Sequence, residues 1–291
     1  MPSIPRPRLR RAHRAGVDAG PEHAAEPNVE IVVHEGASPV GAPGEGGGGL
    51  RWINIERPGP SDRAWLEEHF EFHPLDFEDV ASRNQRPKID EYPDYLFIVL
   101  HFPVFDKSLG RLNTAELDMF VGPDFLITLP NQPIPPVDYL FERCESTEEV
   151  REDLMSKGSG YLLYKIVDDS FDYCFPMLRK MGNKLERVEE DIFEGRSEEV
   201  VRDISNAKQE IINFRKIIRP QRPVLRDLER LDHFLVVLQH VPDALRGVHD
   251  VVEVNVHVLR HVALLTALEI AQHHTLGPDD LAEVDDLLLG V

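Results

Sequence analysis

Two histidines near the C-terminal end stand at a spacing that suits metal binding. His257 and His261 occupy positions i and i+4, so on a helix they would share a face and could bind Zn²⁺. No third ligand follows at a diagnostic spacing, and no general-base glutamate lies between the two. Because histidines are common without a metal, the more ordinary interpretation is that these side chains bind none.

The sequence lacks the residue constellations of the common enzymes. It contains no Gly-rich phosphate loop, no Gly-x-Ser-x-Gly, and no Cys/His pair with an orienting acid at a recognisable spacing. The two cysteines, Cys144 and Cys174, form no disulfide framework and fit a reducing compartment. We therefore expect a protein that is not an enzyme.

Carboxylates dominate the charge of the chain. The formal net charge is -20 at pH 7, which argues against a nucleic-acid partner because phosphate neutralisation needs Lys and Arg. One group of acids follows His73-Pro74 in the early turns of a predicted helix: Asp76, Glu78 and Asp79. A second group forms one face of a later helix: Glu186, Glu189, Glu190, Asp191 and Glu194. The second group could raise the local cation concentration, although a solvated helix face partly neutralised by nearby lysines explains it as well.

That second group belongs to the longest periodic stretch of the chain, residues 159–231. Apolar residues recur there with the 3.5-residue period of a coiled coil, in two runs that each need a partner helix. Gly195 can take the left-handed position after the first helix, and Ser197 can cap the second. The pattern predicts a long antiparallel helical hairpin, with Gln221 as one polar residue on an otherwise apolar seam.

Strands and short helices precede the hairpin. Residues 1–28 are rich in Pro and Arg and are expected to form a disordered leader. Apolar or alternating runs predict strands at 29–33, 50–55, 95–100, 117–121 and 125–129. Helices are expected after a cap at Asp62, after His73-Pro74, and at 137–142 and 147–155. Strands mixed with helices, followed by helices only, indicate an α/β domain over 29–158 and a helical arm over 159–232.

Several strings in this region resemble the CorA family of magnesium and cobalt transporters. The most specific is HPLDFEDVASRNQRPKIDEYPDYLFIVLHF, in which HPLxxEDV is followed by QRPK. WINIE precedes it, and the strings that follow in the family's order are AELDMFVGPDFLITLP, GYLLYKIVDDSFDYCFPMLRKMGNKLERVEEDIFE and NFRKIIRPQRPVLRDL. The resemblance runs from about Trp52 to Leu231. The zinc-transporting relatives of the family share the same pattern.

The resemblance implies a fold and a function. The fold is a cytoplasmic α/β/α domain with a mixed sheet, followed by the long antiparallel helical hairpin and the start of a stalk. Members of the family are homopentamers in the cell membrane that transport Mg²⁺ or Co²⁺, and in some relatives Zn²⁺, through an ion-gated pore. The implied function is therefore the cytoplasmic regulatory domain of a divalent-cation transporter. The alternative is a self-associating scaffold or divalent-metal sensor that does not transport.

The resemblance also implies a metal site at Glu78 and Asp79. In the family's regulatory site, a carboxylate at the position of Asp79 faces an acid on the stalk helix of a neighbouring subunit. Mg²⁺ prefers oxygen ligands and keeps most of its waters, so one or two carboxylates are enough to hold it. The alternative interpretation is that both side chains are solvated acids in the turns of a helix.

The resemblance is expected to end near Asp232. Residues 233–291 contain no Lys, Tyr or Trp, hold seven of the thirteen histidines, and lose the 3.5-residue period. They include neither the Gly-Met-Asn signature of the family's pore nor the roughly 18 apolar residues of a membrane span. We therefore expect an atypical tail, strongly diverged or read in a shifted frame, on a chain without its pore region. A chain complete as written would be soluble and cytoplasmic, and would meet a membrane only through a pore segment that it does not contain.

Overall fold

The chain folds into two compact units. The structure is a computed structural model that describes residues 26–35, 49–82, 85–106, 111–193 and 197–228. Within these residues, the first unit contains the chain up to residue 100 together with 115–163, and the second contains 101–114 and the chain from 164 onward. The predicted tail at 233–291, with His257 and His261, lies outside the described residues, as does the predicted leader apart from 26–28.

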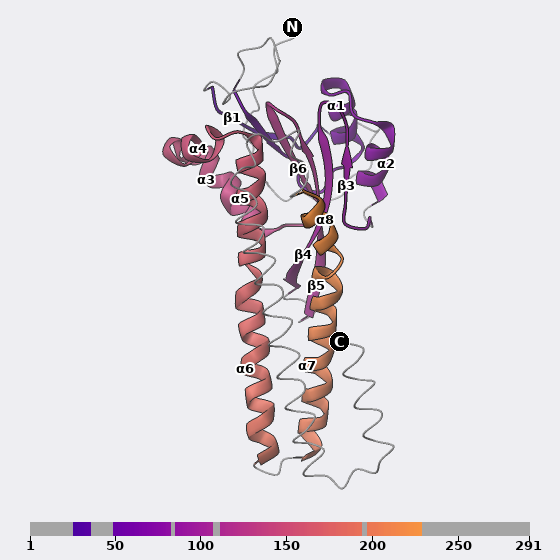
Figure 1. The fold of residues 1–291 in the computed structure, drawn as a ribbon, viewed down its shortest axis with the longest axis vertical. Coiled ribbons are helices and arrows are strands. Elements are labelled where there is room, and N and C mark those ends of the chain that lie inside the picture. Colours follow the sequence, from indigo (N-terminus) through magenta and orange to yellow (C-terminus); the bar gives the residue numbers. More distant parts are fainter. Residues whose placement is uncertain (1–25, 36–48, 83–84, 107–110, 194–196, 229–291) are drawn as a thin grey trace, which may run out of the picture. The chain divides into compact units, whose positions relative to one another are not determined.

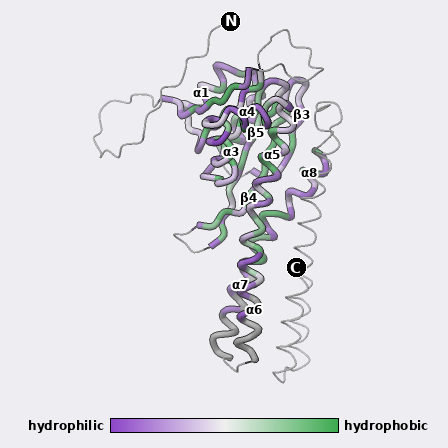
Figure 2. Tube along the Cα trace, turned by 90° about the vertical axis from the view of Figure 1, so that its left-hand side faces the viewer, coloured by the Kyte–Doolittle hydropathy of each residue, from purple (hydrophilic) through white to green (hydrophobic). Residues whose placement is uncertain are grey.

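A six-stranded mixed sheet forms the centre of the first unit (Figure 1). Its strands, in spatial order, are β1 (Glu30–Val33), β2 (Arg51–Asn54), β6 (Phe125–Pro130), β5 (Arg111–Val121), β4 (Leu96–Asp106) and β3 (Lys88–Glu91). Strands β2 and β6 are parallel, whereas β1 is antiparallel to β2, β5 to β6 and β3 to β4. In Figure 2 the hydrophobic residues, drawn in green, gather in these strands, as expected for a sheet that is buried on both faces.

Helices cover both faces of this sheet. On one face lie α1 (Pro60–His69) and α2 (Pro74–Ser82), and on the other lies α3 (Pro135–Ser146), which α4 (Glu148–Met155) follows. The core under α1 and α2 includes Leu66, Phe77, Val80, Phe97, Val99, Phe120, Ile127 and Leu129. On the opposite face, the rings of Trp52 and Phe141 meet edge to face with centroids 5.0 Å apart. The predicted α/β/α arrangement with a mixed sheet is therefore confirmed.

The second unit is built on a long helical hairpin. Helices α6 (Cys174–Phe193) and α7 (Ser197–Ile218) run side by side, and Lys184 Nζ donates a hydrogen bond to Glu210 Oε1 at 2.9 Å. Ile211, Phe214 and Ile218 recur at helical spacing along α7 and are buried, as an amphipathic helix requires. The predicted antiparallel hairpin is confirmed, whereas the side chains of its expected acidic face at 186–194 lie outside those that the structure describes.

Prolines interrupt both arms of the predicted hairpin. Helices α5 (Ser159–Asp172) and α6 are separated at Tyr173, three residues ahead of Pro176. Helices α7 and α8 (Gln221–Leu228) are separated at 219–220, where Pro220 ends the first of them. Since proline has no backbone N–H and clashes with the preceding turn, each run expected to be one continuous helix is divided into two.

The starts of α1 and α2 are fixed by polar side chains. Asp62, expected to cap α1, lies instead inside its first turn, because the helix already begins at Pro60. Its carboxylate accepts hydrogen bonds from the backbone N–H of Gly59 at 2.7 Å and of Asn28 at 2.6 Å, as in a capping box. His73 caps α2, since its Nδ1 accepts the backbone N–H of Leu75 at 3.3 Å.

Candidate functional site

The two carboxylates singled out by the sequence occupy different environments on α2. Asp79 is half-buried and faces the edge of the sheet, whereas Glu78 is exposed. Neighbouring residues on a helix point about 100° apart, so one element cannot aim both side chains at the same point. The structure therefore places Asp79, and not Glu78, among other polar side chains of the first unit.

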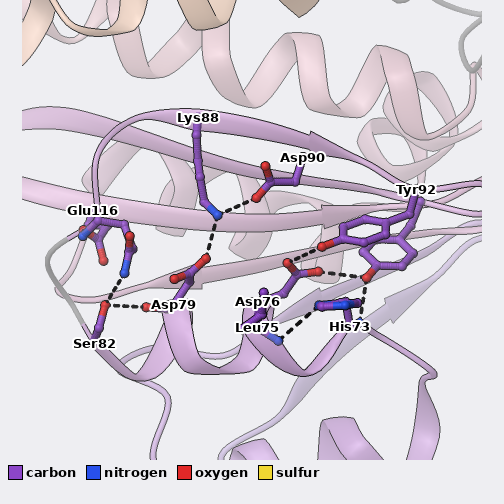
Figure 3. A network of polar contacts seen from close by, with 11 residues as sticks. His73, Leu75, Asp76, Asp79, Ser82, Lys88, Asp90, Tyr92 and Glu116 are labelled. Carbon is purple, nitrogen blue, oxygen red and sulfur yellow. Dashed lines mark hydrogen bonds and ion pairs between the residues drawn. The ribbon is translucent and has the colours of Figure 1, made fainter.

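The partner of Asp79 is Lys88, the first residue of β3 (Figure 3). Lys88 Nζ donates to Asp79 Oδ2 at 2.6 Å and also contacts Asp90 Oδ2, so the ammonium lies between two carboxylates. The same ammonium lies 5.2 Å from the centre of the Phe97 ring. Burial lowers the pKa of Lys88, but its hydrogen bonds to Asp79 and Asp90 outweigh this effect and leave the pKa above its usual value.

A third carboxylate, Asp76, lies one helical turn before Asp79. Its side chain is buried and accepts hydrogen bonds from the hydroxyl groups of Tyr92 and Tyr95, both at 2.8 Å. Burial raises the pKa of Asp76, and the two hydroxyl groups oppose that rise without cancelling it. Burial likewise raises the pKa of Tyr92 to about 12, so both tyrosines remain hydrogen-bond donors at neutral pH.

A fourth carboxylate, Asp118, reaches the same place from the middle of the sheet. Asp118 pairs with Leu129 across β5 and β6, and Lys88 pairs with Val99 across β3 and β4. Paired residues of adjacent strands point to the same face, and both Leu129 and Val99 belong to the core under α2. Asp118 and Lys88 therefore project from the sheet toward α2.

Asp118, like Asp76, is deeply buried. Only 3% of its surface is exposed, and its Oδ1 has no hydrogen-bond partner. Burial raises the pKa of Asp118 well above its usual value, the charges of Glu116 and Asp79 raise it further, and Lys88 opposes them. Glu116 itself accepts the backbone N–H of Gln85 at 2.9 Å through Oε2.

Together these side chains form what we call the Lys88 cluster, which consists of Asp76, Asp79, Lys88, Asp90 and Asp118. Carboxylate oxygens of Asp76, Asp79 and Asp90 lie within 4.8 Å of one another. Oxygen donors at this spacing suit a hard divalent cation such as Mg²⁺, which needs one or two carboxylates and completes its shell with water. A hollow of about 460 Å³ is lined by the two tyrosines and, among other residues, by Phe72 and His73.

A second group of acids lies on α5 in the other unit. Asp168, Asp169 and Asp172 also bring carboxylate oxygens within 4.8 Å of one another. Lys165 donates to Asp168 at 3.2 Å and to Asp169 at 2.6 Å, which neutralises part of their charge. These are neighbours on one partly solvated helix face, and nothing else in the described residues points to a ligand there.

The sequence pattern identified the two helical acids of the Lys88 cluster, Asp76 and Asp79, but not the three residues that come from the sheet. No strand was predicted between residues 55 and 95, yet Lys88 begins β3, a short edge strand. In a strand, alternate residues share a face, so Lys88, Asp90 and Tyr92 would form one polar face. This alternation could have indicated the strand from the sequence. No local signal marks Asp118, because its meeting with Lys88 depends on the pairing of strands far apart in sequence.

The sequence also matches a model of a known protein family. Residues 47–268 match the model described as CorA-like Mg²⁺ transporter protein. The chain belongs to this family. The match extends past Asp232, where the resemblance was expected to end, and includes residues outside those that the structure describes.

Curated relatives of the family are similar to most of the chain. A putative metal ion transporter of Bacillus subtilis, YfjQ, is 30% identical over 182 residues, which make up 62% of this chain and 54% of that protein. The cobalt/magnesium transport protein CorA of Thermotoga maritima is 30% identical over 200 residues, or 68% of this chain and 56% of that protein. The chain thus spans about half the length of the curated relatives it matches.

Solved structures of related proteins share the fold. The cytoplasmic domain of ZntB from Vibrio parahaemolyticus superposes with a TM-score of 0.62 at 18% identity, covering 75% of this chain and 85% of that one. The soluble domain of CorA from Methanocaldococcus jannaschii gives a TM-score of 0.59 at 20% identity, covering 83% and 88%. Within the residues that the structure describes, no helix combines the length and the apolar character that crossing a membrane requires.

Proposed function

We propose that this chain is the cytoplasmic regulatory portion of a CorA-like divalent-cation transporter, and that binding of Mg²⁺ or Co²⁺ at Asp79 controls the opening of the pore. The observation that supports the proposal is the position of Asp79. It lies on the helix that follows His73-Pro74, half-buried and within ligand distance of two further carboxylates. The names of the curated relatives, which include cobalt/magnesium transport proteins, supply the class of ion.

The mechanism would be a change in population, not catalysis. A cation that binds one arrangement of the subunits better than another shifts the equilibrium toward that arrangement. In a homopentamer, each Asp79 would share its cation with a carboxylate of the neighbouring copy, so that occupied sites hold the closed arrangement together. Removal of the cation would then leave like charges facing each other and favour opening.

The first prediction concerns Asp79→Ala. A cation that binds the folded protein raises its melting temperature by mass action, by about 3–6 °C at roughly ten times Kd. We expect this shift in millimolar MgCl₂ or CoCl₂ for the wild type and a much smaller one for Asp79→Ala, measured by differential scanning fluorimetry. Asp94→Ala, which removes an exposed acid outside the Lys88 cluster, is the control and should keep the full shift.

Two outcomes would change the proposal. Equal shifts in the wild type and in Asp79→Ala would remove Asp79 from the site. A reduced shift in Glu78→Ala as well would show that the exposed neighbour also binds the cation, as the family resemblance implies.

A divalent-metal sensor or scaffold would use the same residues, because the Lys88 cluster is formed by one protomer. An ion-flux assay in vesicles that contain the protein separates the two functions. Mg²⁺-dependent flux that falls when internal Mg²⁺ rises supports the transporter, whereas cation binding without flux supports the sensor.

A further inference from the structure

The Lys88 ammonium lies where a cation ligated by Asp79 and Asp90 would lie. Its nitrogen contacts one oxygen of each carboxylate, and both of those carboxylates belong to the group with oxygens within 4.8 Å of one another (Figure 3). An ammonium group and a hydrated divalent ion need the same oxygen atoms. They therefore cannot occupy this position together.

The charges of the cluster are not balanced by this lysine. Asp79 and Asp90 share a single ammonium group, and the charge of that group also acts on Asp76 and Asp118. A cation of charge +2 would offset more of this negative charge than Lys88 does. The electrostatic preference of the cluster is thus for an additional or a more highly charged cation.

Asp118 supplies independent evidence that a ligand can bind here. Its side chain is 3% exposed and projects toward α2, and its Oδ1 has no hydrogen-bond partner. A buried acceptor without a donor destabilises a fold, and most such atoms in proteins are paired. A hydrated cation beside Asp79 would provide this oxygen with a coordinated water or a direct bond.

The site is also open enough for exchange. The side chains of Lys88 and Asp90 are 31% and 39% exposed, and that of Asp79 is 21% exposed. The four-carbon stem of lysine is flexible, so the ammonium can leave the carboxylates and reach solvent.

We propose that Lys88 is a tethered competitor of the divalent cation: Mg²⁺ or a similar ion displaces its ammonium from Asp79 and Asp90 and gains Asp118 as a further acceptor. The inference rests on the proposed function in one respect, since it uses Asp79 as a ligand. It adds that a residue of the same protomer, Lys88, determines how tightly the site binds the cation. Because every binding event must release an ion pair, Lys88 weakens the apparent affinity and moves the response to higher cation concentrations.

The test compares Mn²⁺ binding to purified wild type and Lys88→Met by isothermal titration calorimetry. Mn²⁺ is the probe because it accepts the same oxygen ligands as Mg²⁺. Methionine keeps most of the apolar stem but removes the charge, so the apparent Kd should fall by at least about tenfold. Lys157→Met is the matched control: Lys157 also pairs with an acid, Asp153 at 2.7 Å, and also lies over an aromatic ring, yet it is outside the cluster. An unchanged or larger Kd in folded Lys88→Met overturns the proposal.

The melting temperature of Lys88→Met provides a second test of the proposal. Without Lys88 the carboxylates repel one another, so Lys88→Met should melt at a lower temperature than the wild type in EDTA. Millimolar Mn²⁺ should raise the melting temperature of the variant more than that of the wild type, since the ion replaces the lost ammonium. If the variant is unfolded in EDTA, Mn²⁺ should refold it, as seen by near-UV circular dichroism. No rescue by Mn²⁺ overturns the proposal.

Two further variants separate this inference from the proposed function. Adding Asp118→Asn to Lys88→Met should weaken Mn²⁺ binding about tenfold, and an unchanged Kd would remove Asp118 from the site. If Asp79→Ala abolishes binding while Lys88→Met leaves the Kd unchanged, the competition fails and the regulatory role of Asp79 stands. If Lys88→Met tightens binding while Asp79→Ala has no effect, the regulatory role of Asp79 fails, and Lys88 competes at Asp90 and Asp118 alone.

Discussion

The carboxyl group of Asp138 shows how burial and charge compete at a single residue. It lies in the first turn of α3, where the helix dipole favours a negative charge by roughly 0.3–1 kcal/mol. Burial nevertheless raises its pKa from the usual 3.8 to about 6, and the charges of Glu56, Glu142 and Glu30 add to the rise. Desolvation and repulsion therefore outweigh the dipole, and the ionised form destabilises the fold.

This balance predicts a pH-dependent gain in stability for Asp138→Asn. A carboxyl group with a raised pKa in the folded state costs nothing below its unfolded pKa and destabilises increasingly as the pH rises to about 6. The variant should melt about 2–4 °C above the wild type at pH 7.5. At pH 4 this difference should largely vanish, because the wild-type carboxyl group is then protonated in the folded protein.

The measurement is a series of melting curves between pH 4 and 8. Glu149→Gln, which removes an exposed carboxylate from the start of α4, is the control and should show no gain that grows with pH. A constant difference between Asp138→Asn and the wild type at every pH would contradict the electrostatic account.

The candidate site was only partly predictable at the residue scale. Asp79 could be singled out because it is part of a local string that resembles a family. Lys88 and Asp118 could not be singled out in this way, since strand pairings such as Asp118 with Leu129 bring their side chains to the same face of the sheet. Local sequence carries the identity of ligands on one helix, but the partners that surround them are set by the register of the sheet.

At the scale of elements, strands and helices with strong apolar patterns were predicted well. The runs at 50–55 and 125–129 became β2 and β6, and the 3.5-residue period found the hairpin of α6 and α7. The exception, β3, has the sequence Lys-Ile-Asp-Glu, and its apolar content is too small to indicate a strand. It forms because the edge of β4 offers backbone partners, and Ile89 pairs there with Ile98.

The role of Gln221 also becomes clear only in the tertiary structure. On the sequence it is a polar interruption of an apolar seam, yet its side chain is fully buried at the start of α8. Its Oε1 accepts the backbone N–H of His101 at 3.0 Å, and its Nε2 donates to the carbonyl groups of His101 and Ile217. The amide thus pairs with the part of β4 from His101 onward, which belongs to the second unit, as a neighbouring strand would.

The corresponding prediction is a loss of stability in Gln221→Met. Methionine has a similar volume but cannot pair with the backbone, so the bonds to His101 are lost at a cost of about 2 kcal/mol. The melting temperature should fall by about 4–8 °C. Gln209→Met, which removes an exposed glutamine whose Nε2 donates to Asn213 at 3.0 Å, should change it by less than about 2 °C. A similar effect of both variants would show that Gln221 acts through helix propensity and not through β4.

At the scale of the whole molecule, the family match bears on the atypical tail. The change in composition after Asp232 suggested a strongly diverged end or a shifted reading frame. A shifted frame would abolish family similarity downstream, yet the match continues to residue 268. This counts against a frame change at that point and favours divergence of the tail, whose residues lie outside the described structure.

The last prediction concerns assembly. Each copy carries a formal net charge of -20, so copies of this chain repel one another unless cations neutralise their contacts. If Asp79 shares a divalent ion with a carboxylate of a neighbouring copy, Mg²⁺ should promote a homopentamer beyond what simple screening achieves. We expect light scattering to give five times the monomer mass in millimolar MgCl₂, and a smaller mass in NaCl of the same ionic strength.

Comparing MgCl₂ and NaCl at the same ionic strength distinguishes binding of Mg²⁺ from general charge screening. Asp79→Ala should respond alike to the two salts, because its remaining dependence on salt comes from screening alone. A pentamer that forms equally in NaCl and MgCl₂ would show that the contacts between copies do not need the cation. In that case the ion at Asp79 would act within one protomer, where Lys88 already holds the same carboxylate at 2.6 Å.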